Sequence, residues 1–228
     1  MSKRFDILDA WRSLAVVLMV AYHFLYDLAL FGVITWGQMF STPLNLLQKL
    51  ICCSFILLAG ASARFSRNNL RRGLVVLAAG LAVEIGAAVG GQTIRFGILQ
   101  LMGCAMVLWH FAGKYLQKIP GWVLAAGSAA LFALTDWWTR SVAVTVPWLY
   151  PLGLTRPDFA SADYFPLLPW LFLFLMGTVL GGWCLRHRDC RLLTVPLPGA
   201  LTFPGRHSLL IYLLHQPVLF GLAKLIWG

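Results

Sequence analysis

Long apolar stretches separated by short polar segments dominate the chain. Each stretch has about 17–25 residues, the length that an α-helix needs to cross a bilayer. Their apolar residues run continuously, which favours helical spans over the alternating strands of a membrane barrel. We therefore predict an all-α, polytopic transmembrane helical bundle of about seven spans. The spans run roughly over 10–30, 45–63, 71–90, 95–112, 121–136, 166–185 and 207–226.

Basic residues concentrate on one side of these spans. With the N-terminus in the cytoplasm, all but five of the 18 lysines and arginines fall in cytoplasmic segments, Lys3 and Arg4 among them. The exceptions are Lys49, Arg95, Arg140, Arg156 and Lys224. Because cytoplasmic loops collect basic residues, we predict an internal N-terminus and an external C-terminus. The loop 137–165 is then external, and its Trp137, Trp138, Trp148 and Tyr150 are typical of an interfacial aromatic belt.

The first apolar stretch follows basic residues, as in a secretory signal. Asp6 and Asp9 interrupt that basic start, and no small-residue cleavage site follows the stretch. We therefore expect a retained first helix.

Composition agrees with a membrane protein. The chain is 60% hydrophobic and only 11% charged, whereas soluble domains carry about 25% charged residues. This excludes a soluble globular enzyme. Topology explains the net charge of +10, so we expect no nucleic-acid partner. The five cysteines have no metal-binding spacing, so we expect no metal. We predict a single integral-membrane domain over 1–228, in contact with the lipid bilayer, for which oligomers are possible.

The first span carries polar residues along one helix face. Asp9, Arg12, His23 and Asp27 follow one another on that face, and His23 and Asp27 are one turn apart. In a dyad, the Asp27 carboxylate accepts from one ring nitrogen of His23 and leaves the other as a base or nucleophile. The alternative is a buried histidine that a neighbouring helix satisfies.

Further polar residues are predicted at the same depth, where they would line an outward-facing cavity. They are Glu84, Arg95, Gln100 and Asp163, with His215 near the middle of the last span. Each also has a structural interpretation. In that interpretation Glu84 forms an ion pair with Arg95, and Asp163 is a helix cap. His215 lies beside a proline kink, where it would pack against a neighbouring helix.

Arginines at the cytoplasmic helix ends suit a phosphorylated donor. We single out Arg12, Arg206 and Arg72. The alternative is that topology alone places these charges.

Several segments together resemble one family. LDAWRSLAVVLMVAYHFLYDLALFG resembles the opening helix of a bacterial membrane family, which is similar to the catalytic domain of heparan-alpha-glucosaminide N-acetyltransferase. Further resemblances are in FILLAGAS, RFGILQLMG, DYFPLLPWLFLFLMGTVLG and GRHSLLIYLLHQPVL. The family often has Arg-Gly at Arg12-Ser13, and often a histidine where this chain has Gln100.

The resemblance implies acyl transfer across a bacterial cytoplasmic (inner) membrane. Acetyl-CoA or another acyl-CoA is the implied donor, bound by Arg12, Arg206 and Arg72. A sugar or envelope component offers the hydroxyl or amine, with His23 as base or acyl carrier and Asp27 orienting it. The alternatives are a proton-coupled transporter or flippase, and a non-catalytic partner subunit.

Overall fold

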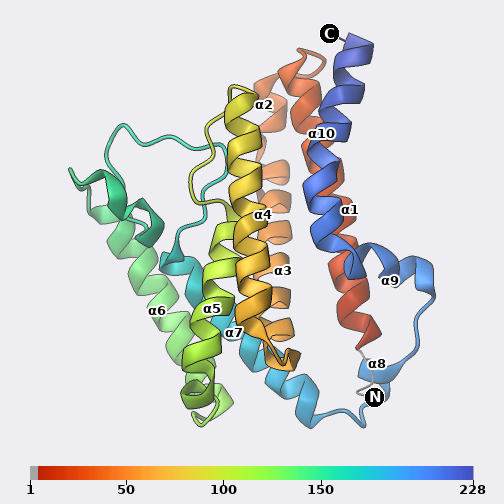
Figure 1. Ribbon diagram of the computed structural model, residues 1–228, viewed down its shortest axis with the longest axis vertical. Helices are drawn as coiled ribbons and strands as arrows, with labels where there is room; N and C mark the ends of the chain where they lie inside the picture. The colour runs from red at the N-terminus through yellow and green to blue at the C-terminus, as the bar shows by residue number, and fades with distance from the viewer. Residues whose placement is uncertain (1–4, 228) are drawn as a thin grey trace. The chain divides into compact units, whose positions relative to one another are not determined.

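The structure is a computed structural model and describes residues 5–227, all of whose regular elements are helices (Figure 1). The long helices are α1 (Asp6–Leu30), α3 (Thr42–Phe65), α4 (Asn69–Val89), α5 (Ile98–Leu116), α6 (Gly121–Ser141), α7 (Leu167–Arg186) and α10 (Ser208–Trp227). The short ones are α2 (Trp36–Met39), the 3-10 helix η1 (Pro147–Leu152), α8 (Arg191–Thr194) and α9 (Gly199–Arg206).

Each of the seven predicted spans coincides with one long helix, so the all-helical fold class is confirmed. Five of these helices, α1, α3, α4, α7 and α10, are long and apolar enough to cross a membrane. The chain is therefore an integral membrane protein. Seven crossings and the orientation of the termini stay predictions, and Lys3 and Arg4 lie outside the described residues.

The chain forms two compact units, which are described one at a time. The first comprises residues 1–55 and 187–228, and the second comprises residues 56–186. In the first unit, α1 packs against α9 and α10 and also contacts α2 and α8. Helices α1 and α10 run in the same direction (Figure 1).

A glycine allows α9 to approach α1 closely. A Cβ atom on Gly205 would collide with the carbonyl oxygen of Asp9. In its place, the N–H of Gly205 donates to Oγ of Ser13 at 2.8 Å, and that hydroxyl donates to the Asp9 carbonyl at 3.0 Å. The hydroxyl of Ser13 thus links the backbone of α9 to the backbone of α1, and the absent side chain of Gly205 permits this close approach.

In the second unit, α4 packs against α5, α6 against α7, and α5 also against α7. The end of α3 that belongs to this unit meets α7 through small residues. Cβ atoms on Gly177 and Gly181 would collide with the carbonyl oxygens of Leu57 and Ala61. The Gly-xxx-Gly spacing within α7 therefore lies at a helix–helix contact.

Two loop segments of this unit, 93–98 and 161–165, are clamped together. Four hydrogen bonds of 2.9–3.1 Å join them. The N–H of Arg95 donates to Oγ of Ser161, and the N–H of Ile98 donates to Oδ2 of Asp163. In the other direction, the N–H of Ala162 donates to the carbonyl of Thr93, and that of Phe165 donates to the carbonyl of Phe96. The segment RFGIL is therefore a structural junction at the start of α5.

The predicted loop 137–165 is partly helical. Helix α6 continues to Ser141, so Trp137 and Trp138 lie on a helix. An ion pair of 2.9 Å between Asp136 and Arg140, one turn apart, supports this extension. Trp148 and Tyr150 lie in η1.

Candidate active site

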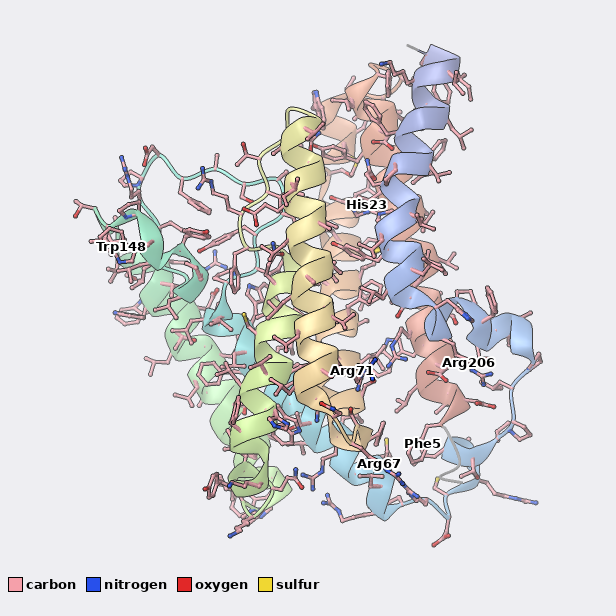
Figure 2. The ribbon with its side chains drawn as sticks, in the orientation of Figure 1. Phe5, His23, Arg67, Arg71, Trp148 and Arg206 are labelled. Carbon is pink, nitrogen blue, oxygen red and sulfur yellow. The ribbon has the colours of Figure 1, made fainter. Side chains whose placement is uncertain are left out.

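Two histidines meet where α1 packs against α10. The ring centroids of His23 and His215 are 4.7 Å apart, and the rings are nearly perpendicular, at 84°. Figure 2 labels His23, which points from α1 toward α10. His215 is buried, and His23 is partly buried. The sequence predicted both residues as site candidates, and the structure brings them together.

The hydrogen bonds of the two rings define their tautomers. Nδ1 of His23 lies 3.0 Å from the carbonyl oxygen of Met19, and Nδ1 of His215 lies 2.7 Å from that of Tyr212. A carbonyl oxygen only accepts, so each Nδ1 must carry the proton. Each Nε2 is then left as the ring atom with a lone pair, which can take a proton or act as a nucleophile.

Asp27 is fully buried on α1, with 0% of its surface exposed. Its Oδ1 accepts a hydrogen bond of 2.7 Å from Nε2 of Gln216 on α10. The predicted hydrogen bond between Asp27 and His23 does not form. Asp27 is bonded to Gln216 instead, and His23 is bonded to the carbonyl of Met19. Side chains on a helix lean toward its N-terminus, so the His23 ring reaches back to Met19, away from Asp27.

Three buried polar atoms around these residues have no hydrogen-bond partner within residues 5–227. They are Oδ2 of Asp27, Oε1 of Gln216 and Nε2 of His215. With Nδ1 of His215 protonated, all three are acceptors. Buried acceptors are normally satisfied, so this arrangement suits a small group that brings donors, such as a hydroxyl or an amine.

Arg12 and Arg206 lie about two turns or more from the histidines, toward the start of α1, and both are paired with acids. Nη1 of Arg12 lies 3.0 Å from Oδ1 of Asp9. Arg206, labelled in Figure 2, approaches Oδ2 of Asp9 at 3.4 Å and Oδ1 of Asp6 at 2.9 Å. Two cations therefore share two anions, which leaves these arginines little unbalanced charge for a donor phosphate.

Gln100 and Glu84 lie in the second unit. Nε2 of Gln100 donates to Oε2 of Glu84 at 3.0 Å and to the carbonyl of Gly80 at 3.2 Å. The predicted ion pair between Glu84 and Arg95 does not form, because the amide of Gln100 holds Glu84 while the side chain of Arg95 is exposed. Gln100 thus has a structural role between α4 and α5.

Asp163 acts as a cap for α5 from a distant loop. Its Oδ2 accepts from the N–H of Ile98, the first residue of that helix, whose N-cap Gly97 has no side chain to do so. Burial raises the pKa of Asp163 to about 6, although the hydrogen bond from Ile98 opposes this shift. The capping interpretation of Asp163 agrees with these contacts, although the cap serves α5 rather than α7.

The remaining candidates are less enclosed. Arg72 is exposed and donates to the carbonyl of Ser62 at 3.3 Å. Among residues 5–227, no three His, Cys, Asp or Glu side chains gather as a metal site would require. A cavity shared by His23 and Asp27 with Glu84, Arg95, Gln100 and Asp163 stays a prediction, because these groups belong to different units.

Sequence reasoning missed Gln216 and Asp6 as partners. Gln216 directly follows His215, and its amide is the kind of group that a buried carboxylate needs. Asp6 precedes Asp9 by three residues, the spacing of one helix face. Both signals were present, but their partners are about 190–200 positions away in the chain.

Comparison with known families identifies a match. The model of the family "heparan-alpha-glucosaminide N-acetyltransferase, catalytic" matches residues 4–217, which is most of the chain. Neither the comparison with curated proteins nor that with solved structures gives a match.

Proposed function

Because the chain belongs to the heparan-alpha-glucosaminide N-acetyltransferase catalytic-domain family, we propose that it is a membrane-embedded acyltransferase that uses acyl-CoA. The acyl group, most simply acetyl, moves from cytoplasmic acyl-CoA to a hydroxyl or amine of a sugar or envelope component. We place the protein in the bacterial cytoplasmic membrane. The observation that carries this proposal is the histidine pair beside three unpartnered buried acceptors.

His23 is the proposed catalytic residue. With Nδ1–H held by Met19, Nε2 takes the proton of the acceptor as its oxygen or nitrogen attacks the thioester carbon. The carbon–sulfur bond breaks, and coenzyme A leaves as a thiolate that takes up a proton. In the second route, Nε2 attacks the thioester carbon, the carbon–sulfur bond breaks, and coenzyme A leaves as a thiolate. The acceptor then attacks the acyl carbon, the carbon–Nε2 bond breaks, and the proton of the acceptor passes through Nε2 to the thiolate.

Asp27 and His215 have supporting roles in this proposal. Oδ2 of Asp27 and Nε2 of His215 accept hydrogen bonds from the incoming hydroxyl or amine and orient it toward His23. Gln216 holds the carboxylate in place through Oδ1. This assigns Asp27 to the acceptor, rather than to the orientation of the histidine ring.

The test is to replace His23 and measure acyl transfer. In His23→Asn, the amide retains hydrogen-bonding capacity but has no basic nitrogen, so we expect transfer to fall at least about 100-fold. The measurement is transfer of label from radioactive acetyl-CoA to an envelope extract by the protein in nanodiscs. His110→Asn is the matched control, because His110 is exposed on α5.

Full transfer by His23→Asn would remove this residue from the mechanism. Label retained on the wild-type protein without acceptor, and absent in the variant, would select the route through an acylated histidine. A proton-coupled transporter would instead move its substrate without any covalent product, and the family match does not favour it.

A further inference from the structure

A small basic pocket opens in the second unit, where α3, α5 and α7 end and α6 begins. Its polar and glycine lining includes Arg64, Trp109, Gln117, Gly121, Gly182 and Arg186, and none of its lining residues is acidic. The cavity volume is about 30 Å³, which limits an occupant to a single group rather than a whole molecule.

The two arginines point at the same place. A Cβ atom on Gly182 would lie 3.4 Å from Nε of Arg64 and 3.8 Å from Nη1 of Arg186. Both guanidinium groups thus approach one point, over a residue that has no side chain to separate them. Like charges this close repel each other, so an anion between them would relieve the repulsion.

Nothing in the described part of the chain balances these two charges. The ion pairs within residues 5–227 involve other arginines, namely Arg12, Arg140, Arg156 and Arg206. Arginines at helix ends often satisfy the last carbonyl groups, but neither Arg64 nor Arg186 donates such a hydrogen bond there. This sets them apart from Arg72, which donates to the carbonyl of Ser62.

Other donors face the same pocket. Helix α6 begins at Gly121, its N-cap Pro120 supplies no side-chain hydrogen bond, and a Cβ atom on Gly121 would lie 3.6 Å from Nη2 of Arg186. The positive end of this helix therefore adds to the field of the arginines. Trp109 is 4% exposed and lines the pocket, and its indole N–H makes no hydrogen bond within residues 5–227.

We propose that this pocket binds one phosphate group between the guanidinium groups of Arg64 and Arg186. Guanidinium pairs phosphate oxygens through two parallel N–H donors, and two such groups fit a tetrahedral anion. The phosphate belongs either to a phospholipid headgroup or to coenzyme A. The coenzyme A source rests on the proposed function, but the phosphate site itself does not.

The experiment measures binding and stability without turnover. The full chain in micelles of dodecyl maltoside, a detergent that has no phosphate, is titrated with coenzyme A, dephospho-coenzyme A and inorganic phosphate. Separate nanodiscs contain phosphatidylglycerol. The variants are Arg64→Gln, Arg186→Gln and, as matched control, Arg67→Gln, which alters an exposed arginine in the turn after α3, labelled in Figure 2.

We expect each pocket variant to weaken anion binding by about tenfold or more, the loss of one charge-assisted partner, while Arg67→Gln binds as wild type. Tighter binding of coenzyme A than of its dephospho form would identify coenzyme A as the source of the bound phosphate. A rise in Tm that occurs only in phosphatidylglycerol nanodiscs would identify a phospholipid headgroup as the source of the bound phosphate.

A second readout separates anion binding from a structural role. Without anion, either pocket variant relieves repulsion, so its Tm should equal or exceed that of wild type. If both pocket variants lose Tm without anion, or bind all probes as Arg67→Gln does, the proposal is overturned. Anion binding without acyl transfer would leave this site standing and contradict only the proposed function.

Discussion

A histidine whose Nδ1–H is held by a carbonyl of its own helix has one defined tautomer. His23 and His215 are both in this state, bound to Met19 and Tyr212. Their Nε2 atoms are therefore prepared as acceptors before any substrate arrives. In the proposed reaction, this fixed tautomer removes part of the cost of orientation.

At the same scale, Asp163 should make stability depend on pH. Its pKa in the folded protein is about 6, above the ordinary 3.8. The folded state therefore binds more protons than the unfolded state between these values, and stability falls as pH rises from about 4 to 6. Above pH 6 the effect is constant. The two-unit difference corresponds to no more than about 3 kcal/mol.

Asp163→Asn keeps an acceptor for Ile98 but does not titrate, so this loss of stability should disappear. The measurement is the difference in unfolding free energy between wild type and variant in detergent from pH 4 to 7. Asp158→Asn, at an exposed aspartate, is the control. A difference that stays constant over this range would contradict the titration of Asp163 between pH 4 and 6.

Sequence spacing predicted which residues share a helix face better than it predicted their hydrogen-bond partners. His23 and Asp27 do share a helix face, but spacing does not reveal that one ring leans back to Met19 while the carboxylate turns to Gln216. The same holds for Glu84, which Gln100 holds in place of Arg95. Partners on other helices depend on packing that no local pattern encodes.

At the scale of elements, glycine contacts determine how closely the helices approach. The backbone of α9 lies against α1 because Gly205 has no Cβ atom. We expect Gly205→Ala to force the helices apart and cost about 1–3 kcal/mol, the usual range for overpacking. It should also disturb the hydrogen bond to Ser13.

Gly199→Ala is the matched control on the same helix, because a Cβ atom there meets nothing within 4 Å. The measurement is the free energy of unfolding in detergent by urea or heat. Equal stability of the two variants would show that the close approach at Gly205 contributes nothing.

The long helices were predictable and the short ones were not. Apolar runs predicted all seven long helices to within about five residues, because the length of a span is a property of the local sequence. Helices α2, α8 and α9 have four to eight residues, too few for a periodic signal. A glycine in the sequence does not show which helix packs against it, so the close contacts between helices could not be predicted from the glycines alone.

At the scale of the whole molecule, the number of crossings is the open prediction. Helices α5 and α6 are long enough to cross, and they pack against α4 and α7. With seven crossings the turn between them is cytoplasmic. If α5 and α6 do not cross, the same turn is external.

Lys118→Cys, in a chain without other cysteines, distinguishes these topologies. We expect the new thiol in this turn to stay unlabelled by a membrane-impermeant maleimide in intact cells and to react after lysis. Asp158→Cys, external in both cases, is the positive control. Labelling of position 118 in intact cells would contradict seven crossings.

The ion pairs of Arg206 also bear on how the protein is made. Arg206 is 197 positions after Asp9 and 200 after Asp6. At about 5–20 residues per second, ribosomes need roughly 10–40 s to span that interval. Throughout this time α1 resides in the bilayer with two acids near its start and neither α9 nor α10 to meet them. Helix α1 therefore completes its contacts only after α9 and α10 have been made, and a chain truncated before residue 199 leaves α1 without these partners.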